Sequence, residues 1–135
     1  MAVSRPAGHP SRDGTIPLIV CGNSPTAIRR AAWLGDGWHP VNLSPHDLTR
    51  GVTAYRAACG DAGRSPGRFI ARHFPGADAP ALEGRPLFTG SPPEIASDVE
   101  RYADAGADEL VVSWADAELD AILRRWQAFR NAVAR

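Results

Sequence analysis

One short stretch of the sequence combines residue types from which an anion site could be built. Gly22, Asn23 and Ser24 stand between an apolar run and a helix signal. Glycine lets the backbone approach a ligand, and the N–H groups and dipole of a helix N-terminus favour an anion such as phosphate. The alternative is structural: Ser24 caps the helix and Gly22 turns the chain. A lone Gly-Asn-Ser does not decide between the two interpretations.

Two histidines follow other apolar stretches. Trp38 and His39 are consecutive, so in a strand one faces the sheet interior or barrel lumen and the other the helix layer. We expect Trp38 to be a core residue. His39 could hydrogen-bond a ligand or titrate near neutral pH, although the sequence shows no partner for it as a catalytic base. His73 has a similar position at the end of a later apolar stretch.

No other catalytic arrangement is evident from the spacing. No Ser-His-Asp combination can be argued, and no paired carboxylates are expected where ligands bind. Asp36, Asp108 and Glu109 precede predicted strands, at the edge opposite to that of catalysis, and are expected to be structural. Cys21 and Cys59 form no Cys-x-x-Cys pair or Cys/His cluster, so we expect buried free thiols and no metal site.

Alternating strand and helix signals must position these residues. Apolar runs predict strands at 16–21, 36–41, 67–74 and 108–114. Apolar residues at helical spacing predict helices at 25–34, 45–62, 92–105 and 117–133. Between them, residues 75–90 are the longest irregular segment.

The predicted helices carry clear start signals. Three begin with Ser-Pro, in which serine caps the helix and proline needs no N–H: these are at Ser24, Ser44 and Ser91. Glu94 adds a capping box, and Asp116 is the expected cap of the last helix. The inner face of the first helix is predicted to comprise Ala27, Ile28, Ala31, Ala32 and Leu34. That of the last comprises Leu119, Ile122, Leu123, Trp126, Phe129 and Val133.

This order of elements predicts an α/β fold with parallel strands and right-handed crossovers. Four βα units are half of an eight-unit barrel or a small open sheet. Such folds bind ligands at the carboxyl ends of their strands. The residues expected there are Cys21, Gly22, Asn23, Ser24, His39, Pro40, Val41, Asn42, His73, Phe74, Ser113 and Trp114.

Length and composition limit the function classes. The chain has 135 residues, 44% of them hydrophobic, and 15 basic against 15 acidic residues. One domain over 16–135 with a flexible N-terminal arm over 1–15 is expected. Zero net charge gives no reason to expect nucleic acid or a membrane as partner. Without a signal peptide or a long apolar run, the sequence predicts a cytoplasmic protein.

Two blocks of the sequence resemble a known family. Residues 16–40, IPLIVCGNSPTAIRRAAWLGDGWHP, closely resemble the region of the fifth and sixth strands in the luciferase-like monooxygenase family, and more narrowly the branch that uses the deazaflavin coenzyme F420 (also written F-420). There, a strand ending in Gly-Gly-Asn or similar precedes A-x-R-R-A-A-x-L-G-D-G-W. Residues 90–112, GSPPEIASDVERYADAGADELVV, resemble the family's G-[ST]-P-E pattern and its Y-x-x-A-G continuation before the eighth strand.

The resemblance implies the C-terminal half of a TIM-type (β/α)8 barrel that performs hydride transfer or oxygenation at a flavin or deazaflavin. The cofactor would be coenzyme F420, with FMN as the alternative. By position, Gly22, Asn23 and Ser24 would lie near the phosphate-bearing tail, and Trp38 and His39 near the cavity mouth. Cys21 stands where the family has its first glycine, which makes close backbone approach at this turn less favourable.

The same resemblance implies an incomplete barrel, since such folds need about 250 residues. We therefore expect a truncated or split oxidoreductase that acts on a small-molecule substrate only when its site is completed. A non-catalytic phosphate-binding or assembly module, or an inactive relic, is the alternative. The first and last strands would be open edges, which normally require pairing. This predicts a homo-oligomer, pairing with a separate N-terminal half, or a poorly stable chain.

Overall fold

A parallel four-stranded sheet is the centre of the fold. In the computed structural model, which describes residues 16–75, 79–114 and 118–134, the strand order is β1 (Ile19–Cys21), β2 (Gly37–His39), β3 (Arg68–His73) and β6 (Glu109–Val112). The helices are α1 (Pro25–Leu34), α2 (Pro45–Asp61), α3 (Pro92–Asp104) and α4 (Leu119–Val133). The predicted α/β class with four parallel βα units is confirmed. The N-terminal arm predicted over 1–15 lies outside the described residues.

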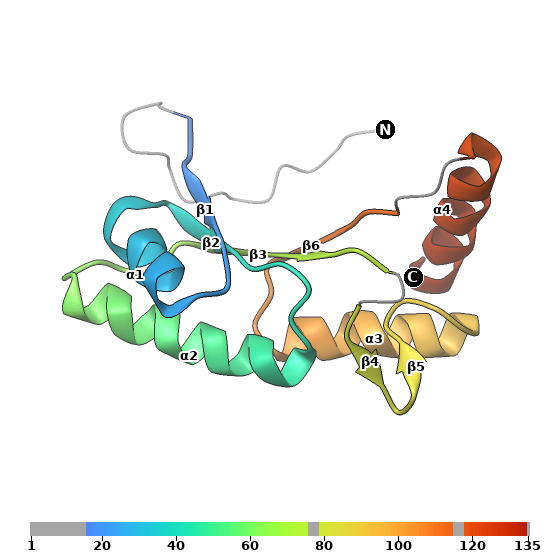
Figure 1. Cartoon of the computed structure of the whole chain (residues 1–135), viewed down its shortest axis with the longest axis horizontal. Coiled ribbons are helices and arrows are strands. Elements are labelled where there is room, and N and C mark those ends of the chain that lie inside the picture. Colours follow the sequence, from blue (N-terminus) through green and yellow to red (C-terminus); the bar gives the residue numbers. More distant parts are fainter. Residues whose placement is uncertain (1–15, 76–78, 115–117, 135) are drawn as a thin grey trace.

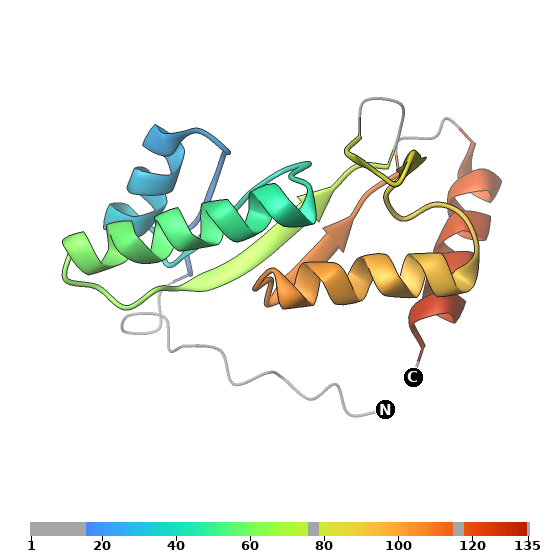
Figure 2. The ribbon, with the colours of Figure 1, turned by 90° about the horizontal axis from the view of Figure 1, so that it is seen from below.

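The helices leave one face of the sheet uncovered. Figure 1 shows α1, α2 and α3 on the same side of the sheet and α4 at its β6 end, and Figure 2 shows α2 and α3 lying across that covered side. Along β3, Phe69, Ala71 and His73 are buried, whereas Arg68, Ile70 and Arg72 between them are half-buried. Successive side chains of β3 therefore alternate between a face that the helices cover and an open face. Strand register assigns the following residues to the open face: Ile19, Cys21, His39, Arg68, Ile70, Arg72, Glu109 and Val111.

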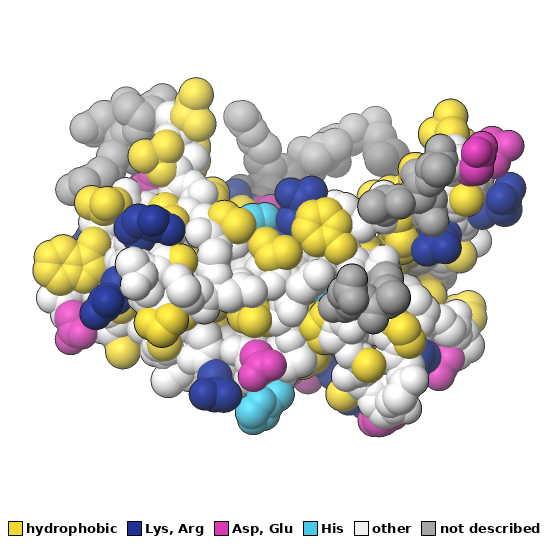
Figure 3. Space-filling model, in the orientation of Figure 1, with side chains coloured by type: hydrophobic (Ala, Val, Ile, Leu, Met, Phe, Trp, Pro, Cys, Tyr) yellow, Lys and Arg dark blue, Asp and Glu magenta, His cyan; other side chains and the backbone are white. Residues whose placement is uncertain are grey.

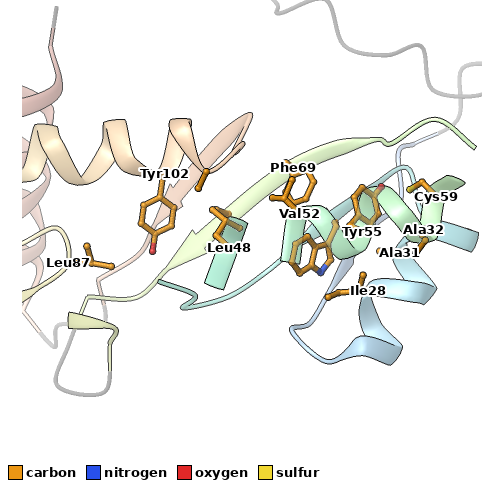
Figure 4. Packing of buried hydrophobic residues seen from close by; sticks show 14 of the residues in the cluster. Ile28, Ala31, Ala32, Leu48, Val52, Tyr55, Cys59, Phe69, Leu87 and Tyr102 are labelled. Atoms are coloured by element: carbon orange, nitrogen blue, oxygen red, sulfur yellow. The ribbon is translucent and has the colours of Figure 1, made fainter. Parts of the chain in front are cut away.

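Three aromatic rings join the sheet to α2. Trp38 is fully buried, its ring centroid 5.2 Å from that of Phe69 and 6.0 Å from that of Tyr55. Figure 4 shows Tyr55 of α2 beside Phe69 of β3. The indole N–H of Trp38 donates to the carbonyl oxygen of Gly22 at 2.7 Å. The prediction of Trp38 as a core residue is confirmed, and its ring faces the helix layer.

The predicted helix starts are confirmed at Ser24, Ser44 and Ser91. The hydroxyl oxygens of Ser24 and Ser44 each accept a bond from the backbone N–H three residues later, at 3.1 Å. Glu94 accepts from the backbone N–H of Ser91 at 2.7 Å, as in a capping box. The predicted cap Asp116 of the last helix lies outside the described residues.

Two predicted inner faces are corrected. Leu34 of α1 is 71% exposed, and no residue of α4 is fully buried. Leu119, Leu123 and Trp126 are 67%, 56% and 48% exposed, while Phe129 packs on Phe88 with ring centroids 6.0 Å apart. The physical reason is position: both helices stand at open ends of the sheet, where no described element covers their outer apolar side.

The segment predicted as irregular, 75–90, contains a hairpin. β4 (Ala81–Leu82) and β5 (Arg85–Pro86) are antiparallel and joined by two residues with positive φ, as in a type I′ turn. Arg85 forms two hydrogen bonds, at 2.8 and 2.9 Å, to the carboxylate of Asp98, which is 1% exposed on α3. These bonds raise the pKa of Arg85. The Asp98 carboxylate also accepts from Phe88 N–H at 2.7 Å, so this one side chain fixes the hairpin on α3.

Two glycines of α2 provide a matched test of the Trp38 packing. A Cβ on Gly51 would overlap the Trp38 ring, whereas a Cβ on Gly60 would have no atom within 4 Å. Gly51→Ala should destabilise the fold by about 1–3 kcal/mol through overpacking, and Gly60→Ala should stabilise it by about 0.5–1 kcal/mol through helix propensity. Urea unfolding followed by circular dichroism measures both. Equal shifts for the two variants would contradict the packing described here.

Candidate functional site

The Gly22 turn connects β1 to α1 at the carboxyl edge of the sheet. Gly22 has φ of +126°, and a Cβ there would lie 2.8 Å from that of Ala27. Its N–H donates to the His39 carbonyl at 3.2 Å, and its own carbonyl accepts from Trp38. Glycine is therefore required by backbone conformation and packing, and both backbone polar groups of Gly22 are occupied by β2.

Two asparagines hold the loops at this edge together. The side-chain amide of Asn23 donates to the carbonyl of Val41 at 2.7 Å and accepts from its N–H at 2.9 Å. Asn42, with φ of +51°, accepts from the N–H of Phe74 at 2.8 Å. Each side chain links one strand end to the next. The Asn23 amide is thus committed to the chain itself, and this arrangement supports the structural interpretation of that side chain.

Ser24 caps the helix as predicted, and few backbone N–H groups remain at this helix end to bind an anion. Its hydroxyl accepts from the N–H of Ala27, and its carbonyl accepts from the N–H of Ile28 at 3.0 Å. Pro25 has no N–H. Thr26 is the remaining donor of the first four helical positions, so a phosphate at this helix end would rely on Thr26 N–H and the helix dipole.

His39 lies on the open face with a defined tautomer. Its Nδ1 is 2.6 Å from the carbonyl oxygen of Ile70, which can only accept, so Nδ1 carries a proton and in the neutral imidazole the lone pair is on Nε2. The two alternatives for consecutive residues are thereby resolved: Trp38 faces the helices and His39 faces the side that is the lumen in a closed barrel.

Arg72 is a site residue that the sequence reasoning missed. It lies on the open face near the end of β3, bridged to Val41, and its Nη2 donates to the Ser113 hydroxyl at 3.3 Å. The guanidinium carbon is 4.5 Å from the centroid of the Phe74 ring. Its Nε is buried without an acceptor, and no carboxylate in the described part of the chain pairs with it. The alternation of apolar and polar residues over 68–73 indicates this position. A strand that buries Phe69 directs Arg72 to the opposite face of the sheet.

Side chains from β1, β2 and β3 and from the residue that follows β6 thus form a row across the open face at the carboxyl edge. We call this the carboxyl-edge row: Cys21, His39, Arg72 and Ser113. Cys21 is paired with His39, and Arg72 is bridged to the residue two beyond His39. The row offers a permanent cation, a hydroxyl, an imidazole lone pair and a thiol. Chemically it can bind an oxyanion and accept one proton.

His73 does not join this row. It is fully buried on the helix side, its ring centroid 4.8 Å from that of Phe88. Tyr102 O–H donates to the carbonyl of Leu43 at 2.6 Å and accepts from His73 Nδ1 at 3.2 Å, while the buried His73 Nε2 has no partner among the described residues. Burial lowers the pKa of His73 to about 4, although Asp98 acts in the opposite direction. His73 is therefore a neutral core residue at neutral pH.

The acidic residues at the amino edge are structural, as predicted. Asp36 accepts from the N–H of Leu18 at 2.9 Å, Asp108 accepts from that of Phe69 at 2.8 Å, and Glu109 pairs with Arg68.

The expectation of two buried free thiols is half wrong. Both thiols are free, but only Cys59 is buried, and burial raises its pKa. Cys21 is exposed because it ends a strand on the uncovered face.

Two hollows lie outside the row. One hollow, of about 320 Å³, lies between α3, α4 and residues 88–90. The other, of about 490 Å³, lies between the start of α2 and the start of the hairpin. Neither is lined by a member of the carboxyl-edge row. Among the described residues, no three His, Cys, Asp or Glu side chains gather to hold a metal ion, and no helix is long and apolar enough to cross a bilayer.

Comparisons with known proteins bear on the fold. No family model and no curated protein matches the chain. Among solved structures, 16 chains match. One is an F420-dependent secondary alcohol dehydrogenase in complex with an F420–acetone adduct, with a TM-score of 0.67 and 14% identity over 91% of this chain and 50% of that chain. The likeness shows that the four βα units adopt part of a TIM-type barrel fold, and this chain spans half the length of that neighbour.

The burial of His73 predicts acid sensitivity. Its pKa is about 4 in the folded chain, against an ordinary value of 6.5, so the unfolded chain binds more protons between these values. The stabilising contribution is complete above pH 6.5 and is lost as pH falls to about 4, on the order of 3 kcal/mol. Urea unfolding should show a smaller pH dependence for His73→Gln than for the wild type. The exposed His46→Gln control should behave like the wild type, and an unchanged dependence in His73→Gln would refute the assignment.

Proposed function

We propose that this chain is the C-terminal half of a luciferase-like oxidoreductase barrel, truncated or split, and that it contributes the side of the site that holds the phosphate-bearing tail of coenzyme F420. The observation that carries the proposal is the position of the Gly22 turn and of Arg72 at one carboxyl edge of an uncovered parallel sheet. The resemblance of residues 16–40 and the fold of the F420-dependent neighbour support it.

The residues present fit an anionic group. The Nε of Arg72 is buried without an acceptor, and a buried donor left unpaired is costly. A phosphate at the open face would pair with the Arg72 guanidinium, which no carboxylate of the described residues neutralises, while Ser113 holds its Nη2 in place. When bound, F420 supplies hydride transfer at its deazaflavin ring, and FMN is the alternative cofactor. Arg72, Ser113 and Thr26 N–H would hold the tail.

His39 is the residue of this half suited to proton handling. Its Nδ1–H is held by the Ile70 carbonyl, so Nε2 is the acceptor of the neutral imidazole, and the side chain lies on the open face. An imidazole of this kind can accept a proton from a substrate hydroxyl. A redox site must also exclude water, and the open face of the described sheet gives no such enclosure. The chemistry therefore depends on whatever covers that face.

A non-catalytic anion-binding or assembly module is the second candidate. It is favoured by the commitment of Asn23 and Ser24 to intramolecular bonds and by the absence of a carboxylate among the members of the carboxyl-edge row. Such a module would use the same Arg72 site as the proposed oxidoreductase half, but it would catalyse no reaction. An inactive relic would have no ligand at all.

Cofactor binding is tested with the purified chain. We expect F420 or FMN to bind by fluorescence titration, with inorganic phosphate as competitor. Arg72→Gln should weaken binding roughly tenfold, the worth of one charge-assisted hydrogen bond. The matched control Arg29→Gln, on the exposed side of α1, should leave affinity unchanged. Gly22→Val should also weaken binding, and its fold must be checked because φ of +126° strains any side chain. If the chain has no affinity for either cofactor, the proposed phosphate site is refuted.

A further inference from the structure

We propose that the partner completing this half-barrel is a second copy of the same chain. The β6 and α4 end of each copy would lie against the β1 and α1 end of the other, and this contact would occur twice. The inference rests on the proposed function only for the chemistry of the finished site. Its structural basis is the two ends of the sheet.

Both ends of the sheet are unpaired in the described chain. In the order β1-β2-β3-β6, β1 pairs only with β2, and β6 only with β3. Each end therefore exposes backbone N–H and C=O groups to any strand that can reach them. Because all four strands are parallel, β6 of one copy can continue into β1 of another without reversing direction.

The exposed large hydrophobic side chains collect at these same two ends. At the β1 and α1 end they are Ile16, Leu18, Trp33 and Leu34, and at the β6 and α4 end they are Val111, Leu119, Leu123 and Trp126. In the described residues none lies on α2 or α3, the helices in the middle of the layer. Figure 3 shows hydrophobic side chains over α1 and over α4, at opposite ends of the molecule. Apolar surface gathered in this way marks an interface.

Symmetry explains why the occupant is a second copy. Two copies supply eight parallel strands, the number that closes a barrel of this type. A two-fold axis along the barrel axis makes the two contacts identical and leaves no end open. The chain carries no net charge, so two copies do not repel each other. The open faces then enclose the lumen, and both carboxyl-edge rows lie at the same mouth, so each site is bounded by the other copy.

Sedimentation velocity without cofactor tests the pairing. The wild type should sediment as a species of twice the 14.4 kDa chain mass. Leu34→Arg and Leu119→Glu each place a charge at one end, with a sign that suits its helix terminus. Each should raise the dissociation constant roughly a hundredfold or more, since an unpaired charge becomes buried in both contacts. Arg124→Glu, beside the apolar stripe on α4, is the control and should remain dimeric.

Mixing the two variants distinguishes this arrangement from others. A mixed dimer of Leu34→Arg with Leu119→Glu has both substitutions in one contact and keeps the other contact wild-type, so mixing should restore association in part. Circular dichroism verifies that each variant is folded, and Trp33→Arg with Leu123→Glu is a second pair. A monomeric wild type overturns the proposal, as does a dimer that Leu119→Glu disrupts and Leu34→Arg does not. Dimers that bind no F420 would refute the proposed function alone, and monomers that bind it would refute the pairing alone.

Discussion

A parallel sheet is normally buried on both faces, and in the described chain only one face of β1-β2-β3-β6 is covered by helices. This constraint organises the molecule. The covered face contains the apolar core around Trp38, and the neutral His73 belongs to it. The open face contains the half-buried polar side chains, including His39 and Arg72. The residues that could bind a ligand or accept a proton therefore lie on the face of the sheet that no described helix covers.

Local signals predicted the framework well. The Ser-Pro starts of α1, α2 and α3 succeed because a cap and a proline act within one helical turn. The alternation of β3 and the pairing of consecutive βα units follow from short connections between parallel strands. The expected carboxyl edge was also correct in position, since strand ends are fixed by chain direction. Whether Gly22, Asn23 and Ser24 hold a phosphate stays a prediction.

Features that depend on contacts between residues far apart in the chain were not predicted from the sequence. Nothing near Asp98 indicates that Arg85 reaches it from a hairpin, and the apolar stripe of α4 was assigned to the core because its spacing matches a buried face. Arg72 was missed because its role arises from an unpaired Nε and from Ser113 on a neighbouring strand. Cys21 was expected to be buried because free cysteines usually are, and its exposure depends on the uncovered face of the sheet.

Both ends of this sheet are open in the described part of one chain, and in our proposal association closes them. Hydrogen–deuterium exchange of the β1 and β6 backbone amides, followed as protein concentration rises, tests it most directly. Protection of these two strands should increase with concentration, while the amides of β3 and α2 in the interior should remain equally protected throughout. Edge strands whose exchange is the same at every concentration would contradict the account.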